Sequence, residues 1–275
     1  MLARFMRRNA IGTLRPKLRS DVRTGVSKSN GVHFRLVGEI LRHVLRVTAR
    51  ELRVTPLMRL YHFVSEKYGI ENIEKQRLKV SRIEDLNDPF ELLGLELADG
   101  TLRKRLLNLK HQMSQDRGIL CFSRAWTNPV QWSHYADLHR GVCLGFEVSP
   151  GLSIPVEYSA RRLAPEAKQL LTGPITKEAM RRVLCTKYSH WKYEQEERIF
   201  VSLEASNKDS KGLYFENFSS DLALVTIIVG VRSSISRDQI NRALRSMSGQ
   251  VAIFKARLAF RSFRVVRNRD ESLWT

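Results

Sequence analysis

The sequence contains no apolar run long enough to cross a membrane, which takes roughly 18 residues or more. Its longest apolar run, Leu222–Val229, has the length of a strand. Cysteine is scarce as well, because the chain holds only Cys121, Cys143 and Cys185, and these form no CxxC pair. We interpret all three as reduced, buried thiols of a cytosolic protein that pack as small hydrophobic groups.

Several signatures of known function classes are also missing. The sequence has no GxxxxGK[ST] and no GxGxxG pattern, which argues against P-loop or Rossmann nucleotide binding. It has no GxSxG nucleophile elbow. No RNA-recognition, helix-turn-helix, OB-fold or zinc-finger signature is present either, so nucleic-acid binding would rest on charge alone.

Positive charge is the strongest compositional signal. The chain has a formal net charge of +19, and +11 of it falls in residues 1–60, where 14 Lys/Arg accompany 3 Asp/Glu. Such an excess favours contact with nucleic acid or another polyanion. It does not by itself define a binding site.

The basic N-terminal part is predicted to be an extension over residues 1–56. By composition, residues 1–30 resemble a disordered basic arm, an upstream segment from a misassigned start codon, or a transit peptide, and we favour the first two. Residues 34–53 are predicted to form an amphipathic helix with an arginine-rich polar face. That face would suit nucleic acid, an anionic membrane or the surface of the domain itself.

The rest of the chain is predicted to be one α+β domain over residues 57–265, followed by a frayed basic tail over 266–275. Strands and helices mix without strict βαβ alternation, which favours a mixed, mostly antiparallel sheet flanked by helices. Expected strands lie at 60–63, 78–81, 119–123, 142–146, 156–158, 222–229 and 251–260 and at the end of 191–201. Expected helices lie at 66–75, 101–115, 129–137, 164–171, 174–187 and 237–247. Ser65 is expected to cap the 66–75 helix, and Ser236 with Gln239 is expected to form a capping box for the last helix.

The densest group of aromatic, imidazole and carboxylate side chains lies in residues 128–147. Asn128 is a good N-cap and Pro129 suits the first turn of a short helix ending near Asp137. A buried strand follows at Val142–Phe146. The junction would gather Trp132, His134, Tyr135, Asp137 and His139, either as core aromatics with surface histidines or as a functional site.

Three blocks of residues have a recognisable order and spacing. They are Leu60–Phe63 with Asn87–Glu91 and Cys121–Ser123, then Trp132–Asp137 with His139–Cys143, and finally Trp191–Glu196 with Arg198. Together they resemble the bacterial domain of unknown function numbered 2971, over residues 57–260. The resemblance implies no activity, because that family's name carries none.

A second resemblance, to ADP-ribosyltransferases, implies chemistry. Those enzymes use a His on a first strand, a stacking aromatic and a Glu on a late strand. Here His62 opens the domain as in the DNA-targeting members, and Glu194-Gln195-Glu196 resembles their ExE motif. The resemblance implies that NAD is the substrate and that its ADP-ribose group is transferred onto nucleic acid or a bacterial target in a defence or toxin setting. It assigns catalysis to Glu196 as the catalytic carboxylate, with Glu194 assisting and His62 holding the ribose. It assigns cofactor binding to His62, Tyr61, Tyr135 and Trp132, with Tyr135 as the stacking ring.

The two acids of the motif have a physical logic. In an extended segment, Glu194 and Glu196 would share a face and Glu197 would point away. Neighbouring carboxylates repel, so one gains proton affinity, and a fixed carboxylate stabilises positive charge developing on a ribose. The alternative is a solvated acidic face paired with Arg198 and Lys192. Residues expected to contact substrate or to shape the motif are Asn87, Asp88, Glu91, His134, Asp137 and Arg198.

Two other functions compete. A metal-dependent nuclease would use His134, Asp137 and His139, with Asp88 or Glu91 as a further ligand, although the leading interpretation expects no metal. A nucleic-acid-binding module without catalysis would use the basic extension together with the 101–110 helix. That helix carries Arg103, Lys104, Arg105 and Lys110.

Overall fold

The computed structural model describes residues 56–172, 176–247 and 249–274. The predicted extension, including its amphipathic helix at 34–53, lies outside these ranges except for residue 56. The predicted Gly173-Pro174 break between two helices lies outside them as well. Within the described ranges, no helix is both long and apolar enough to cross a membrane.

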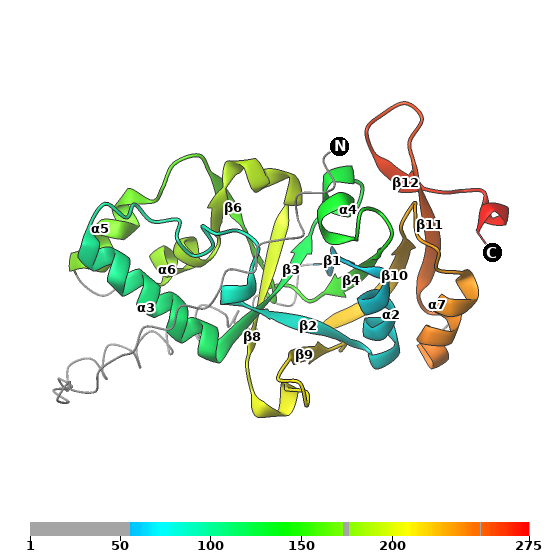
Figure 1. Ribbon diagram of the computed structural model, residues 1–275, viewed down its shortest axis with the longest axis horizontal. Helices are drawn as coiled ribbons and strands as arrows, with labels where there is room; N and C mark the ends of the chain where they lie inside the picture. The colour runs from blue at the N-terminus through cyan, green and yellow to red at the C-terminus, as the bar shows by residue number, and fades with distance from the viewer. Residues whose placement is uncertain (1–55, 173–175, 248, 275) are drawn as a thin grey trace, which may run out of the picture.

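The described residues build one curled, mixed sheet, which confirms the predicted α+β class (Figure 1). Its main strand order is β12-β11-β10-β4-β1-β3-β2-β9, and β8 pairs with both β3 and β5. The neighbouring strands are antiparallel except for β10 and β11. The strands are β1 Met58–Val64, β2 Arg77–Arg82, β3 Arg117–Ser123, β4 Val142–Val148, β5 Ile154–Pro155, β8 Glu196–Ser202, β9 Tyr214–Asn217, β10 Leu222–Val229, β11 Ala252–Leu258 and β12 Val265–Arg267, and a separate parallel pair comprises β6 Glu157–Ser159 and β7 Thr186–Tyr188.

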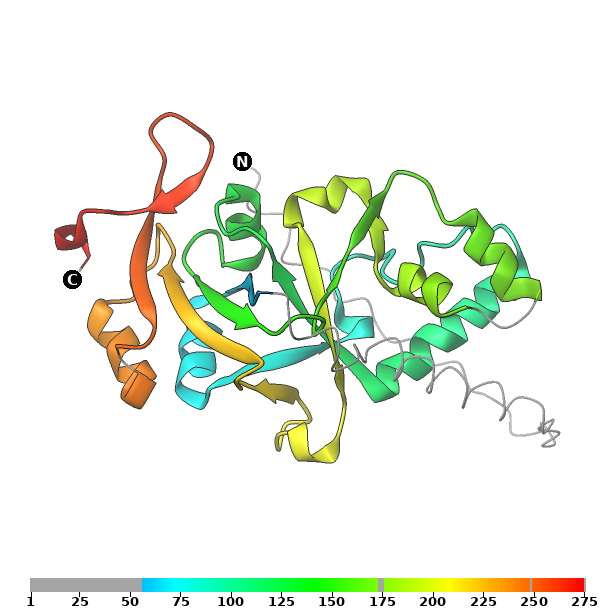
Figure 2. The same ribbon diagram turned by 180° about the vertical axis from the view of Figure 1, so that it is seen from behind.

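Helices cover the sheet and extend it at one end. The helices are α2 Glu66–Lys75, α3 Gly100–Asp116, α4 Pro129–Tyr135, α5 Ala164–Thr172, α6 Lys177–Leu184 and α7 Arg237–Leu244. Figures 1 and 2 show α3, α5 and α6 grouped at one end of the molecule, with α7, β11 and the C-terminal end at the other. The short 3₁₀ helices are η1 Ile83–Asp85, η2 Ser189–Glu194, η3 Ala205–Asn207, η4 Arg245–Met247 and η5 Glu271–Leu273.

The predicted helix caps at Asn128 and Ser236 are confirmed, whereas the side chain of Ser65, the predicted cap of α2, makes no hydrogen bond to its helix. The side chain of Asn128 accepts a hydrogen bond from Val130 N at 2.9 Å at the start of α4. Ser236 and Gln239 form the reciprocal capping box at the start of α7. These local signals succeed because a cap satisfies backbone N–H groups of its own helix and needs no distant partner.

Strand β4 is the centre of the sheet, between β1 and β10. Its sequence is almost continuously apolar because both faces are covered. Leu144 and Phe146 pack in the core beneath α2 and α7, whereas Cys143 packs with Trp132 of α4 on the other face. A further core, between α3, α5 and α6, is built around Leu106, Met180 and Leu184 and stabilises the helical end.

Two fold predictions are wrong in detail. The helix predicted over 174–187 ends at Leu184, and the chain turns into β7. The C-terminal tail is not frayed, because β12 pairs with β11 and Trp274 is buried. The Trp274 indole donates to Ile235 O at 2.8 Å, and the guanidinium of Arg237 lies 4.7 Å from its ring centroid. A single tryptophan at the end of a basic segment thus anchors the segment to the domain.

One edge of β3 pairs with two different strands, first β2 and then β1. That edge pairs with β2 through Gly118 and Ile119 and meets β1 only at Ser123. Between these contacts, residues 120–122 have no strand partner on this side, although their other edge pairs with β8 throughout. A gap between β1 and β2 therefore opens over the middle of β3, and this gap contains the candidate site.

Glycine is required where the α4–β4 connection crosses the end of β1. A Cβ atom on Gly141 would lie 2.1 Å from Val64 O, and the neighbouring backbone leaves no flexible group to give way.

We expect Gly141→Ala to lower the free energy of unfolding by about 3 kcal/mol, the upper part of the range for overpacking. Urea unfolding checks this. The control is Gly100→Ala, whose nearest neighbour is the tip of Arg103 at 3.4 Å and which should change stability by less than about 1 kcal/mol. Equal stability of the two variants would contradict the expectation.

Candidate functional site

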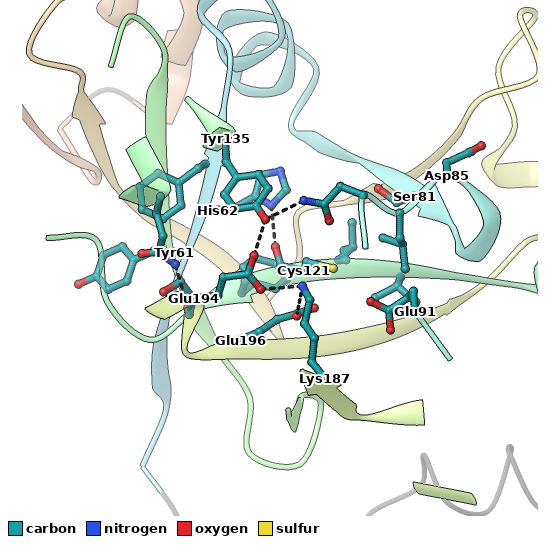
Figure 3. A pocket seen from close by; sticks show the side chains of 18 of the residues that line it. Tyr61, His62, Ser81, Asp85, Glu91, Cys121, Tyr135, Lys187, Glu194 and Glu196 are labelled. Carbon is teal, nitrogen blue, oxygen red and sulfur yellow. Dashed lines mark hydrogen bonds and ion pairs between the residues drawn. The ribbon is translucent and has the colours of Figure 1, made fainter. Parts of the chain in front are cut away.

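A pocket of about 280 Å³ lies in the gap between β1 and β2 (Figure 3). Its walls come from β1, β2 and the unpaired middle of β3, with α4, η2, β7 and the segment 85–91 closing it. Segments far apart in the sequence therefore share one cavity. His62, Tyr61, Tyr135, Glu194, Glu196, Asn87 and Glu91 all line it, as do Lys187, Gln131 and Cys121.

His62 enters the pocket from β1. Its Nδ1 atom lies 3.0 Å from the carbonyl oxygen of Cys121, one of the β3 groups without a strand partner on that edge. A carbonyl can only accept, so Nδ1 carries the proton and Nε2 is left as an acceptor. Burial lowers the pKa of His62, and the hydrogen bond to Cys121 offsets only part of that effect. The neutral imidazole can thus accept a hydrogen bond from a ligand hydroxyl.

Glu194 and Tyr135 form the polar centre of the pocket. The Tyr135 hydroxyl donates to Glu194 Oε1 and accepts from Asn87 Nδ2 at 2.9 Å. Gln131 of α4 donates to the Glu194 backbone carbonyl at 2.8 Å, which holds the end of η2 against α4. Burial raises the pKa of Glu194, and the opposing effects of Lys187 and Tyr135 do not cancel it. This carboxyl is therefore the one whose proton affinity is suited to proton transfer.

Glu196 has a different environment, although it is only two residues away. Arg198 Nε donates to its Oε1 at 2.9 Å, and Lys187 Nζ lies 3.2 Å from its Oε2. Burial alone would raise the pKa of Glu196, but the charges of Arg198 and Lys187 outweigh it and lower the pKa to about 2. This carboxylate stays ionised and is held in place by its cations.

Arg198 connects β8 to the loop before α3. Its guanidinium is fully buried and makes a bidentate contact with Glu91, at 2.6 Å and 2.9 Å. Arg198 Nη1 also donates to Leu184 O at 2.6 Å. The predicted alternative of a solvated acidic face is wrong for this residue, because a surface arginine would not be enclosed by two buried carboxylates.

Lys187 is a charged pocket residue that the sequence does not single out. Its ammonium group lies 2.6 Å from Glu194 Oε2, and it is 6% exposed. Burial would lower the pKa of Lys187, but Glu196 and Glu194 outweigh it and raise that pKa. Residue 187 was predicted to end a helix. The one available signal was the alternation in Thr186-Lys187-Tyr188, too short to identify β7.

The buried cluster carries an excess of negative charge. Its acids are Glu91, Glu194 and Glu196, and its bases are Lys187 and Arg198. With Glu194 ionised, three carboxylates are balanced by two cations. The pocket therefore favours a ligand that is cationic or that becomes cationic during reaction.

The extended backbone expected to bring the two acids together is wrong. Gln195 has a left-handed backbone (φ 46°), so Glu194 ends η2 and Glu196 begins β8, and the segment is not extended. Both acids reach the same place because each contacts Lys187. Glu197 lies away from the pocket, fully buried and paired with Arg124.

Two other predicted residues lie in the core or in a turn. Trp132, predicted to contact a cofactor, is fully buried against Phe63 and donates to Trp126 O at 2.6 Å, outside the pocket. Asp88 accepts from Phe90 N at 2.9 Å and stabilises its own turn.

The predicted metal ligands do not converge. His134 Nδ1 lies 2.9 Å from the Tyr193 hydroxyl, His139 Nε2 lies 3.2 Å from Ser133 Oγ, and Asp137 pairs with Arg140 on the surface. Among the described residues, no group of three or more His, Cys, Asp or Glu is placed to hold a metal ion. His134, Asp137 and His139 therefore do not form the metal site that the nuclease alternative requires.

The basic face of α3 is largely engaged within the protein. Arg103 donates to Leu97 O at 2.7 Å, and Arg105 donates to Leu170 O at 3.1 Å. Lys110 donates to Glu91 O at 2.9 Å. These contacts hold the helix against the neighbouring segments.

Residues 131–199 match the model of a family described as "Protein of unknown function (DUF2971)". These residues, called the DUF2971 segment below, are similar to that family. The DUF2971 segment contributes Tyr135, Lys187, Glu194, Glu196 and Arg198, whereas His62, Asn87 and Glu91 come from before it. No curated protein and no solved structure matched the chain.

The charge cluster of the DUF2971 segment yields a stability prediction. Arg198→Met leaves Glu91 and Glu196 buried without their shared cation, so we expect the free energy of unfolding to fall by about 3–5 kcal/mol at neutral pH. The exposed Arg140, paired with Asp137, is the control, and Arg140→Met should cost less than about 1 kcal/mol.

The same measurement has a pH signature. The folded pKa of Glu196, about 2, lies below its ordinary value of 4.5, so its contribution is fully present above pH 4.5 and is lost as the pH falls toward 2. The difference between the native chain and Arg198→Met should shrink over that range. Similar small losses for both arginine variants would contradict the assigned role of Arg198.

Proposed function

We propose that the pocket binds NAD and that the protein transfers its ADP-ribose group, with Glu194 as the carboxylate facing the reacting ribose. The observation that supports this most is the meeting of His62 from β1, Tyr135 from α4 and Glu194 from η2 in one cavity. An imidazole acceptor, an aromatic ring and a carboxylate are the three groups that this chemistry uses. Their convergence from distant segments makes the pocket a better candidate than any single motif.

Glu194 suits the catalytic position better than Glu196. Both oxygens of Glu196 are engaged by Arg198 and Lys187, and its low pKa makes it a weak base. Glu194 has one oxygen on the neutral hydroxyl of Tyr135, a partner that a ribose hydroxyl can replace without leaving a charge unpaired. In the proposal, Glu196 and Arg198 position Lys187, and Lys187 positions Glu194.

The electrostatics support a reaction through a positive centre. The nicotinamide ring of NAD is cationic, and positive charge moves to the ribose as the C–N glycosidic bond breaks. The bonding electrons leave with nicotinamide, which becomes neutral. The acceptor then forms the new bond to the ribose carbon and gives up a proton, which Glu194 can accept. The negative excess of the cluster stabilises the ribosyl cation between these events.

His62 and Tyr135 have supporting roles in this arrangement. The Nε2 atom of neutral His62 would accept a hydrogen bond from a ribose hydroxyl, while Nδ1 stays on the Cys121 carbonyl. The ring of Tyr135 would stack on nicotinamide, and its hydroxyl, fixed by Asn87, would orient the carboxylate. In the proposal, His62 and Tyr135 bind and orient NAD, and Glu194 stabilises the positive charge that develops on the ribose.

Nicotinamide release tests the proposal without a known acceptor, since water can replace it. We expect the native chain to give binding heat on titration with NAD and to release nicotinamide. Glu194→Gln should reduce the release rate by about 100-fold or more, because a neutral amide cannot stabilise the cation, while NAD affinity changes by less than about tenfold.

The control for this experiment is Glu147→Gln, which removes an acid that pairs with Arg59 on the surface. That variant should keep native rates. Absence of both heat and nicotinamide from the native chain would refute NAD as the ligand. Undiminished release by Glu194→Gln would refute the assignment of the carboxylate.

A further inference from the structure

A second cavity, of about 270 Å³, lies on the opposite side of β7 from the first. Successive residues of a strand point to opposite sides, so Lys187 lines the first pocket while Thr186 and Tyr188 line the second. The turn that carries residues 90 and 91 also contributes to both cavities, because Glu91 lines the first and Phe90 lines the second. The two cavities therefore share their dividing wall and have separate linings.

The charge of the second cavity is opposite to that of the first. Arg161 and Arg162 line it, and no carboxylate does. Arg162 Nη1 donates to the carbonyl oxygens of Leu93 and Leu95, both at 3.2 Å, which fixes the guanidinium. Neither arginine forms an ion pair with any acid in the part of the chain that the structure describes. Two unpaired guanidinium groups at a cavity favour an anion, phosphate in particular.

Aromatic faces stand beside these cations. Phe90 is 53% exposed and Tyr188 is 46% exposed, which is unusual for side chains of this size. Each is oriented by a neighbour, since the Arg162 guanidinium lies 5.1 Å from the Phe90 centroid and His190 stacks on Tyr188 at 4.6 Å. Exposed, oriented rings are platforms on which a planar base can stack.

A buried polar atom completes the lining. Thr186 is 6% exposed, and its Oγ1 has no hydrogen-bond partner among the described residues. A hydroxyl can both donate and accept, so it can pair with the edge of a base. Opposite it, Gly94 has no side chain to fill the space, and even an added Cβ atom would approach Thr186 no closer than 3.7 Å.

We propose that this cavity binds a single nucleotide unit, with its phosphate on Arg161 and Arg162 and its base stacked on Tyr188 or Phe90. The volume of about 270 Å³ is just below the roughly 300 Å³ at which small-molecule pockets begin, so the cavity can enclose one nucleotide unit. The unit can come from a free mononucleotide or from a single strand of nucleic acid. The proposal does not depend on the function of the first pocket.

Calorimetric titration of the full chain with AMP and with a short single-stranded oligoadenylate tests the proposal. Arg161→Gln and Tyr188→Ala should each weaken AMP binding by about tenfold or more, as expected for loss of a phosphate contact or a stacked base. Both side chains are exposed, so the variants should keep the native unfolding transition. Arg257→Gln is the matched control, because Arg257 also lies over an exposed ring, Phe260, at 4.5 Å but lines neither of the two cavities.

Glu194→Gln separates the two cavities. Unchanged AMP affinity in that variant, with losses in Arg161→Gln and Tyr188→Ala, would support the second cavity. Oligoadenylate that binds more tightly than AMP, and that loses affinity in the same two variants, would also support the proposal. The nucleotide unit would then come from a single strand of nucleic acid. Absence of binding by both probes would overturn the proposal. An AMP affinity that is unchanged in Arg161→Gln and Tyr188→Ala, or that falls in Glu194→Gln instead, would also overturn it.

Discussion

The buried guanidinium of Arg198, between the carboxylates of Glu91 and Glu196, is the contact on which the pocket depends. An isolated charge at this depth would be prohibitively unstable, so each partner holds the others in place. Through this contact, β8 is tied to the turn before α3, and through Lys187 it is tied to β7 and η2. Four separate segments thus become one rigid wall facing the gap between β1 and β2. Hydrophobic packing builds the two cores on either side, and the ion pairs fix the site between them.

Two acids separated by one residue have opposite properties because their surroundings differ. Glu196 lies beside the guanidinium of Arg198 and the ammonium group of Lys187, so it stays ionised. Glu194 contacts the phenol of Tyr135 and shares the same ammonium group, and its higher pKa makes it easier to protonate. Environment can assign different roles to like carboxyl groups in this way. The left-handed Gln195 between them is what allows both side chains to reach Lys187 from different secondary structures. In the proposed reaction, Glu196 therefore fixes the position of Lys187, and Glu194 acts on the substrate.

The sequence predicted what depends on neighbouring residues. The cap of α4 at Asn128, the apolar strand β4 and the capping box at Ser236 all follow from local patterns, and the structure confirms them. It also singled out His62, Tyr135, Glu194 and Glu196, which share the pocket. It placed Glu196 ahead of Glu194 as the catalytic carboxylate, whereas the proposal made here favours Glu194. The difference between the two acids comes from Arg198 and Lys187, whose burial is a tertiary property. Lys187 itself was missed because three residues are too few to distinguish a strand from a helix end. Trp132 was assigned to a ligand because an aromatic residue near a candidate site has the same sequence signature as one in the core.

The central claim is that the two neighbouring acids differ in proton affinity, and NMR titration of their ¹³C-labelled carboxyl groups tests it most directly. Spectra of Glu194→Gln and Glu196→Gln would assign the two signals. We expect Glu196 to titrate near pH 2 and Glu194 to titrate above its ordinary value of 4.5. Coincident titrations, or a higher pKa for Glu196 than for Glu194, would contradict the claim.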